Sequence, residues 1–161
     1  MRKKKALRPQ QVLPALHSSK AGTLWADSAS FHYANASPSG LQLSVSFKES
    51  GLGNSGFSSV DIEVGANATA TYQCFNGGGN HPQAANKETV SGPVTGSGQF
   101  PVRNGSTTGT ITVSLPGPGS FSCPSGQKLV LQSGTFSNIT ITDLTESDGP
   151  VSTTPDFIAV P

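Results

Sequence analysis

The sequence is poor in charge, in aromatic rings and in cysteine. Of its 161 residues, 12% are charged, 7% are aromatic and 34% are hydrophobic, with one Trp and two Cys. The hydrophobic fraction is low for a globular domain. The net charge is only +1, however, which excludes disorder driven by charge repulsion. Gly, Ser, Thr and Asn fill the remainder, a composition typical of short strands joined by polar turns.

Positive charge is scarce beyond the N-terminal segment. Six of the ten basic residues lie among the first twenty, and from Asp27 onward four basic residues stand against nine acidic ones, a net charge of −5. A protein that binds nucleic acid neutralises phosphates with Lys and Arg. The sequence therefore predicts no nucleic-acid partner.

The first 26 residues resemble a degenerate signal peptide. Met1–Lys5 is basic, and Leu24–Ala26 resembles a cleavage site that would leave Asp27 as the first mature residue. Pro and polar residues interrupt the apolar middle, and a basic tail is the alternative interpretation. No run of about 18 apolar residues is present, so no membrane span is predicted. We expect a secreted, extracellular protein.

The two cysteines have no metal-binding or C-x-x-C spacing. Cys74 and Cys123 each lie beside a predicted strand, 49 positions apart. We expect them to form one disulfide, which suits an exported domain; two buried free thiols are the alternative.

Alternation of apolar and polar residues dominates from residue 28 onward. The clearest strand is Leu41–Lys48, and the first strand is expected to point Phe31 and Tyr33 inward. A strand around Val90–Val94 is interrupted by Gly92 and Pro93, which favours a sheet edge. Phe136 is out of phase with Ile139, which indicates a bulge near Ser137–Asn138.

These patterns predict an all-β fold of about seven to nine short strands. We expect a single antiparallel β-sandwich, immunoglobulin-like or of related Greek-key topology, with one disulfide. Its expected bounds are residues 27–145. Residues 146–161 are interpreted as a C-terminal tail or an added edge strand.

Three segments resemble uncharacterised secreted proteins of filamentous soil bacteria. They are Trp25–His32, Asn76–Lys87 and Gly119–Pro124, and the resemblance covers roughly residues 22 to 145. It implies a cleaved signal and a cysteine pair, and it brings no activity.

The Gly-rich loop after Cys74 is the most distinctive candidate site. Its glycines can expose backbone N–H groups, and loops on a rigid scaffold often bind ligands. It lacks the Lys and Ser/Thr of a P-loop. The candidate ligand-binding residues are Asn76, Gly77, Gly78, Asn80, His81, Gln83, Asn86 and Lys87. A solvated connection without a ligand is the alternative.

No set of residues predicts catalysis, a metal or a cofactor. No serine lies in a G-x-S-x-G elbow. Asp61 and Glu63 lie two apart on one strand face, as solvated residues do, and would be paired acids only if that face formed a cleft. His32 and His81 would need a third ligand to hold zinc. We therefore expect a non-enzymatic structural, adhesive or self-assembling protein whose partner is a second copy at an edge strand. A module that binds an extracellular glycan or small ligand through loop 76–87 is the alternative.

Overall fold

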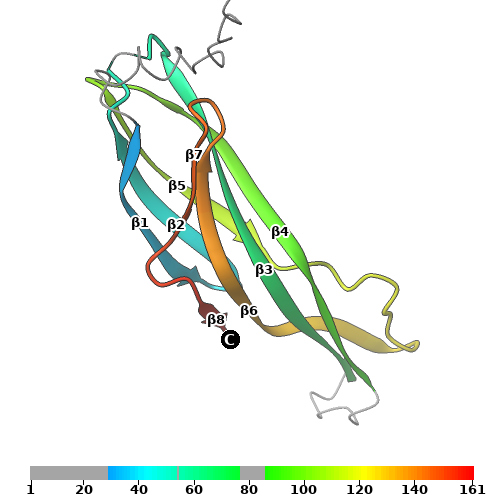
Figure 1. Ribbon diagram of the computed structural model, residues 1–161. Helices are drawn as coiled ribbons and strands as arrows, with labels where there is room; N and C mark the ends of the chain where they lie inside the picture. The colour runs from blue at the N-terminus through cyan, green and yellow to red at the C-terminus, as the bar shows by residue number, and fades with distance from the viewer. Residues whose placement is uncertain (1–28, 54, 77–85) are drawn as a thin grey trace, which may run out of the picture.

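The computed structural model describes residues 29–53, 55–76 and 86–161. Two antiparallel sheets pack face to face (Figure 1). The strands are β1 (Ser30–Ser39), β2 (Gln42–Ser50), β3 (Ser59–Asn76), β4 (Lys87–Pro101), β5 (Ser106–Ser114), β6 (Gln127–Asp143), β7 (Asp148–Ser152) and β8 (Ile158–Val160). The predicted β-sandwich is confirmed.

The strand order differs between the two sheets. Sheet A has the order β1-β2-β5, and sheet B has the order β4-β3-β6-β7, with β8 also paired to β6. Strand β4 is therefore an edge strand, as predicted. No helix in the described part of the chain is long and apolar enough to cross a membrane.

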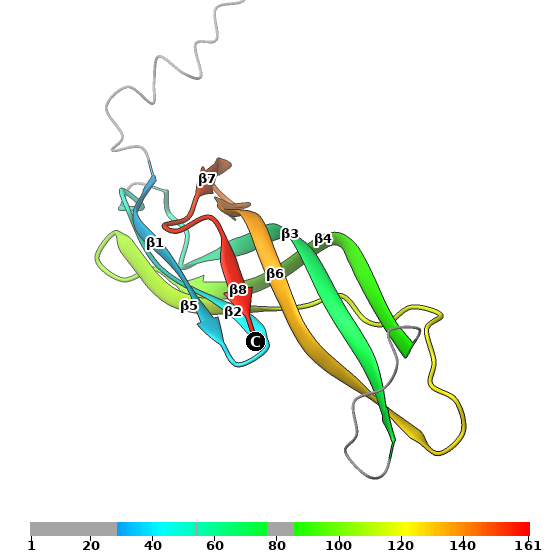
Figure 2. The ribbon, with the colours of Figure 1, turned by 90° about the horizontal axis from the view of Figure 1, so that it is seen from below.

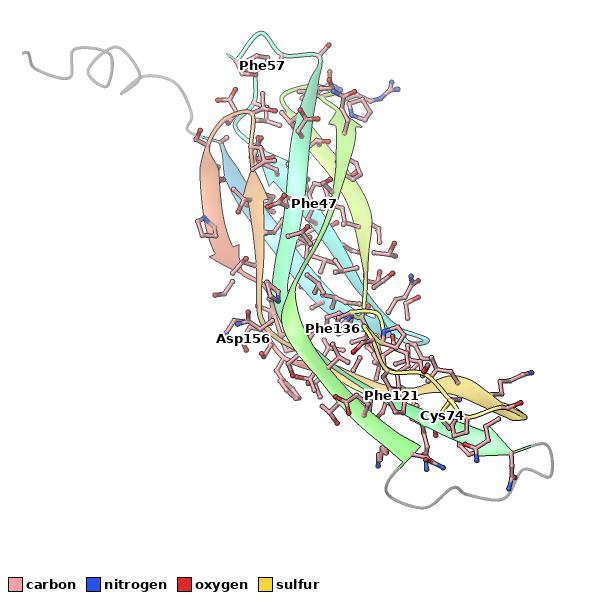
Figure 3. All side chains as sticks on the ribbon, turned by 90° about the vertical axis from the view of Figure 1, so that its right-hand side faces the viewer. Phe47, Phe57, Cys74, Phe121, Phe136 and Asp156 are labelled. Atoms are coloured by element: carbon pink, nitrogen blue, oxygen red, sulfur yellow. A yellow bond between two sulfur atoms is a disulfide. The ribbon has the colours of Figure 1, made fainter. Side chains whose placement is uncertain are left out.

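The core lies between the sheets and follows the alternation of the sequence. Leu43, Val45 and Phe47 point inward from β2 and are completely buried. The Phe47 ring meets the Phe100 ring edge to face at 4.9 Å (labelled Phe47 in Figure 3). The Phe100 ring also fills the space beside Gly109, where a Cβ would overlap it. Gly109 thus lets β5 approach β4 closely.

Sheet B continues beyond sheet A (Figures 1 and 2). We call this part the extension and define it as residues 69–76, 87–93 and 127–133. Residues 115–126, the cover segment, connect β5 to β6 and lie against it. The Tyr72 hydroxyl donates a hydrogen bond to the Pro116 carbonyl at 2.7 Å. Leu115 packs where a Cβ at Gly134 would otherwise stand.

The disulfide joins the extension to the cover segment. Cys74 and Cys123 are bonded, with their Cα atoms 5.6 Å apart. Cys74 is completely buried, and Figure 3 places it with Phe121 at this end of the molecule. The predicted bridge is confirmed, and it ties a strand to a connection between the sheets.

Two details of the strands were predicted wrongly. A bulge between Phe31 and Tyr33 reverses the phase of β1, so that Tyr33 is 42% exposed and Ala34 and Ala36 are buried instead. Strand β4 is continuous through Gly92 and Pro93, because a residue without an N–H group is tolerated at a sheet edge.

The end of the chain adds two strands to sheet B. The pairing of β3 with β6 shifts between Ser137 and Thr140, which confirms the predicted bulge, and Asn138 has a φ of 50°. Strands β7 and β8 then pair with β6. Ile158 and Val160 are buried in the same core as Phe47.

Candidate functional site

The described residues of the predicted ligand site lie at the end of the extension. Of its eight residues, Asn76, Asn86 and Lys87 are described, and Gly77, Gly78, Asn80, His81 and Gln83 lie outside the described residues. Asn76 is opposite Gln127 on β6, and the Asn86 side-chain amide donates to the Gln127 side-chain oxygen at 3.3 Å. The structure thus joins the amide side chains of Asn86 and Gln127, with Asn76 as the strand partner of Gln127.

A hollow lies next to this tip, between β4 and the cover segment. It has a volume of about 390 Å³ and is lined by Glu88, Pro118, Ser120, Phe121 and Ser122. Its walls combine an aromatic ring with hydroxyl groups and one carboxylate. Such a surface suits a polar ligand that carries an apolar face.

A second polar hollow lies at the opposite end of the sandwich. It is also about 390 Å³, and its lining includes His32, Lys48 and Asn104. Asp61 is exposed on the outer face of β3, as expected of a solvated residue, and lines neither hollow. His81, which the sequence analysis considered with His32 as a zinc ligand, lies outside the described residues.

A cluster of carboxyl groups lies buried between the sheets, at the end of the sandwich that carries the second hollow. The sequence analysis did not predict it. Glu49 is the last inward residue of β2, and Asp143 is the last residue of β6; both are completely buried. Glu146 and Asp148, from the turn and from β7, lie close enough to act on Glu49 electrostatically. We call these four residues the carboxyl cluster.

The cluster lacks compensating donors. Both carboxyl oxygens of Glu49 are buried without a hydrogen-bond donor, as are one oxygen each of Asp143, Glu146 and Asp148. Asp143 uses its other oxygen, Oδ1, to accept from the Thr145 and Glu146 backbone N–H groups at 2.7 and 3.1 Å. Among the described residues, every charged group that acts on Glu49 is another acid.

Burial and the neighbouring acids raise the pKa of two members of the cluster, Glu49 and Asp148. Desolvation, followed by the charge of Asp143 and a hydrogen bond to its carboxylate, raises the pKa of Glu49 to about 8. Desolvation and then Asp143 also raise the pKa of Asp148. The hydrogen bond between Glu49 and Asp143 exists only when one of them carries a proton, because two carboxylates have no donor to share.

Chemically, Glu49 can hold a proton at neutral pH and release it as the pH rises past about 8. Across the described ranges, no group of three or more His, Cys, Asp or Glu side chains is arranged to hold a metal ion. The missed signal was in the strand pattern, because the inward series Leu43, Val45, Phe47 continues to position 49, which is Glu.

Comparison with known proteins found no match. No family model, no curated protein and no solved structure is significantly similar to this chain. The function must therefore be argued from the chain itself.

Proposed function

We propose that this protein is a secreted, non-enzymatic structural or adhesive protein that assembles through the edges of its extension. The observation that carries the proposal is the unpaired state of both edges among the described strands. Among the described strands, β4 pairs only with β3, and residues 127–133 of β6 also pair only with β3. Unpaired N–H and C=O groups along an edge are a template for another chain.

Two different edges favour an open assembly. If β4 of one copy pairs with residues 127–133 of β6 in the next copy, the contact is heterologous, and repeating it builds a filament unless the rotation closes a ring. The disulfide stiffens the extension on the side of the cover segment, and a disulfide of this kind suits an oxidising, extracellular compartment.

The outer faces of the sheets also suit a structural role. Hydroxyl side chains bond across neighbouring strands, Thr69 to Ser91 at 2.9 Å and Ser46 to Thr110 at 3.0 Å. These contacts order the surface without charge, so copies can approach one another without strong electrostatic repulsion.

We expect Thr89→Lys combined with Ser91→Lys to abolish self-association, because the added charges repel a strand that pairs with β4. Both positions are exposed on β4. Analytical ultracentrifugation over a concentration series, with electron microscopy of the concentrated samples, measures the effect. Gln42→Lys adds the same charge at an exposed position on β2 and should leave association unchanged. A wild-type chain that stays monomeric at every concentration would refute the proposal.

A second candidate function is glycan binding at the hollow beside the tip. Phe121, which is half-buried, lines this hollow together with the hydroxyl-bearing Ser120 and Ser122, and an apolar wall with a few polar groups is typical of a small-ligand site. We expect Phe121→Ala to remove binding on a glycan array, whereas Phe57→Ala, which removes an exposed ring elsewhere, should not. An array on which the wild type binds nothing rules this candidate out.

A further inference from the structure

We propose that Glu49 and Asp143 form a proton-operated latch between the two sheets. While the pair shares a proton, the latch holds the β6–β7 corner closed. When both groups are ionised, the corner opens. The β6–β7 corner comprises residues 140–152. The latch joins the end of β2 in sheet A to the end of β6 in sheet B.

Among the described residues, the charged groups that act on Glu49 and the strand partners of the latch include no cation. Across sheet A, Glu49 lies opposite Phe31 on β1 and Thr107 on β5. Across sheet B, Asp143 lies opposite Ile62 on β3 and Asp148 on β7. The Thr107 hydroxyl is itself buried without a partner. With acids, an alcohol and apolar groups as its described neighbours, the pair is neutralised by a proton.

The position of the shared proton follows from the hydrogen bonds. Two backbone N–H groups already donate to Asp143, which therefore serves as the acceptor of the pair. Glu49 receives no such donor, so it carries the proton and donates it to Asp143. Removing that proton leaves two charges side by side in a buried site, which costs far more than one paired charge.

The corner is the part of the fold that can yield. Strand β7 has five residues and meets β6 at three register pairs, interrupted by a shift before Asp143. It lies at the edge of sheet B opposite β4, and Leu144 in the adjoining turn is 53% exposed. Regions with few buried contacts open before the core does. Repulsion at the latch is therefore relieved by movement of this corner.

Hydrogen exchange at single amides tests the latch. The reporters are the N–H groups of Leu144, Thr145 and Glu146, which donate to Asp61 O and to Asp143. Because the pKa of Glu49 is raised from 4.5 to about 8, closure is favoured at low pH and weakens as pH rises through that window. Protection factors, corrected for intrinsic exchange, should fall by up to about tenfold per pH unit there.

Two variants separate the latch from general effects of charge. Glu49→Gln supplies a neutral donor to Asp143 at every pH, so its corner should stay protected to pH 9. Glu88→Gln removes an exposed acid on β4 and should behave as the wild type does. The Val45 amide reports the core and should keep its protection in all three proteins.

Three results would overturn the proposal. The first is an equal pH response in Glu49→Gln and the wild type. The second is an equal loss of protection at Val45 and at the corner, which would mean global unfolding. The third is that millimolar Ca²⁺ alone restores the protection of the corner amides in the wild-type protein at pH 9 to its low-pH level, which would make the cluster a cation site. None of these readouts depends on self-association, which is measured separately.

Discussion

Replacing both bridged cysteines, Cys74→Ser with Cys123→Ser, should lower the free energy of unfolding by about 4 kcal/mol. The bridge closes a loop with a sequence separation of 49, which restricts the unfolded chain strongly. In the folded state it also holds the cover segment on the extension, where sheet A gives no support. Urea denaturation followed by circular dichroism measures the change.

A matched control separates the bridge from the serines themselves. Ser122→Ala changes an exposed residue beside Cys123 and should leave stability within about 0.5 kcal/mol of the wild type. Reduction of the wild type should reproduce the loss seen in the double variant. A double variant as stable as the wild type would show that Leu115 and Tyr72 hold the cover segment without the bridge.

The second large effect is expected from Phe47→Ala, at about 3–5 kcal/mol of unfolding free energy. Phe47 is completely buried and meets the rings of Phe31 and Phe100 at 6.1 and 4.9 Å. Truncation leaves a cavity between β1, β2 and β4, and Gly109 has no side chain with which to fill it. Thermal or urea unfolding measures the loss.

The control is a ring of the same type on the surface. Phe57 is 48% exposed, so Phe57→Ala should cost less than about 1 kcal/mol. A loss of similar size in both variants would contradict the placement of Phe47 at the centre of the core.

The sequence predicted the sandwich because its strands bury one face each. Leu43, Val45 and Phe47 alternate with polar residues, and this pattern alone determines which side faces the core. The pairing of Cys74 with Cys123 followed because no third cysteine competes. The edge position of β4 followed from Pro93. The strand pattern and the edge position depend on the residues of one short segment each, so they can be predicted without knowing the fold.

Signals that depend on distant partners were lost. The bulge that exposes Tyr33 is a feature of the pairing of β1 with β2. The carboxyl cluster contains residues nearly a hundred positions apart, and the sequence around Glu49 does not indicate that Asp143 is its neighbour. An acid in an inward strand phase is a local anomaly, but its meaning depends on which residue the other sheet places opposite it.

The length of β3 has a mechanical consequence. With 18 residues it runs from the sandwich through the extension, hydrogen-bonded to β4 on one side and β6 on the other. Its ladder bonds lie across the strand direction, so tension along β3 shears many of them together instead of opening them in turn. The Cys74–Cys123 bond also prevents the chain between these two residues from extending when the protein is pulled at its ends. A force applied at the end of the extension should therefore stretch the molecule little until the whole sandwich unfolds.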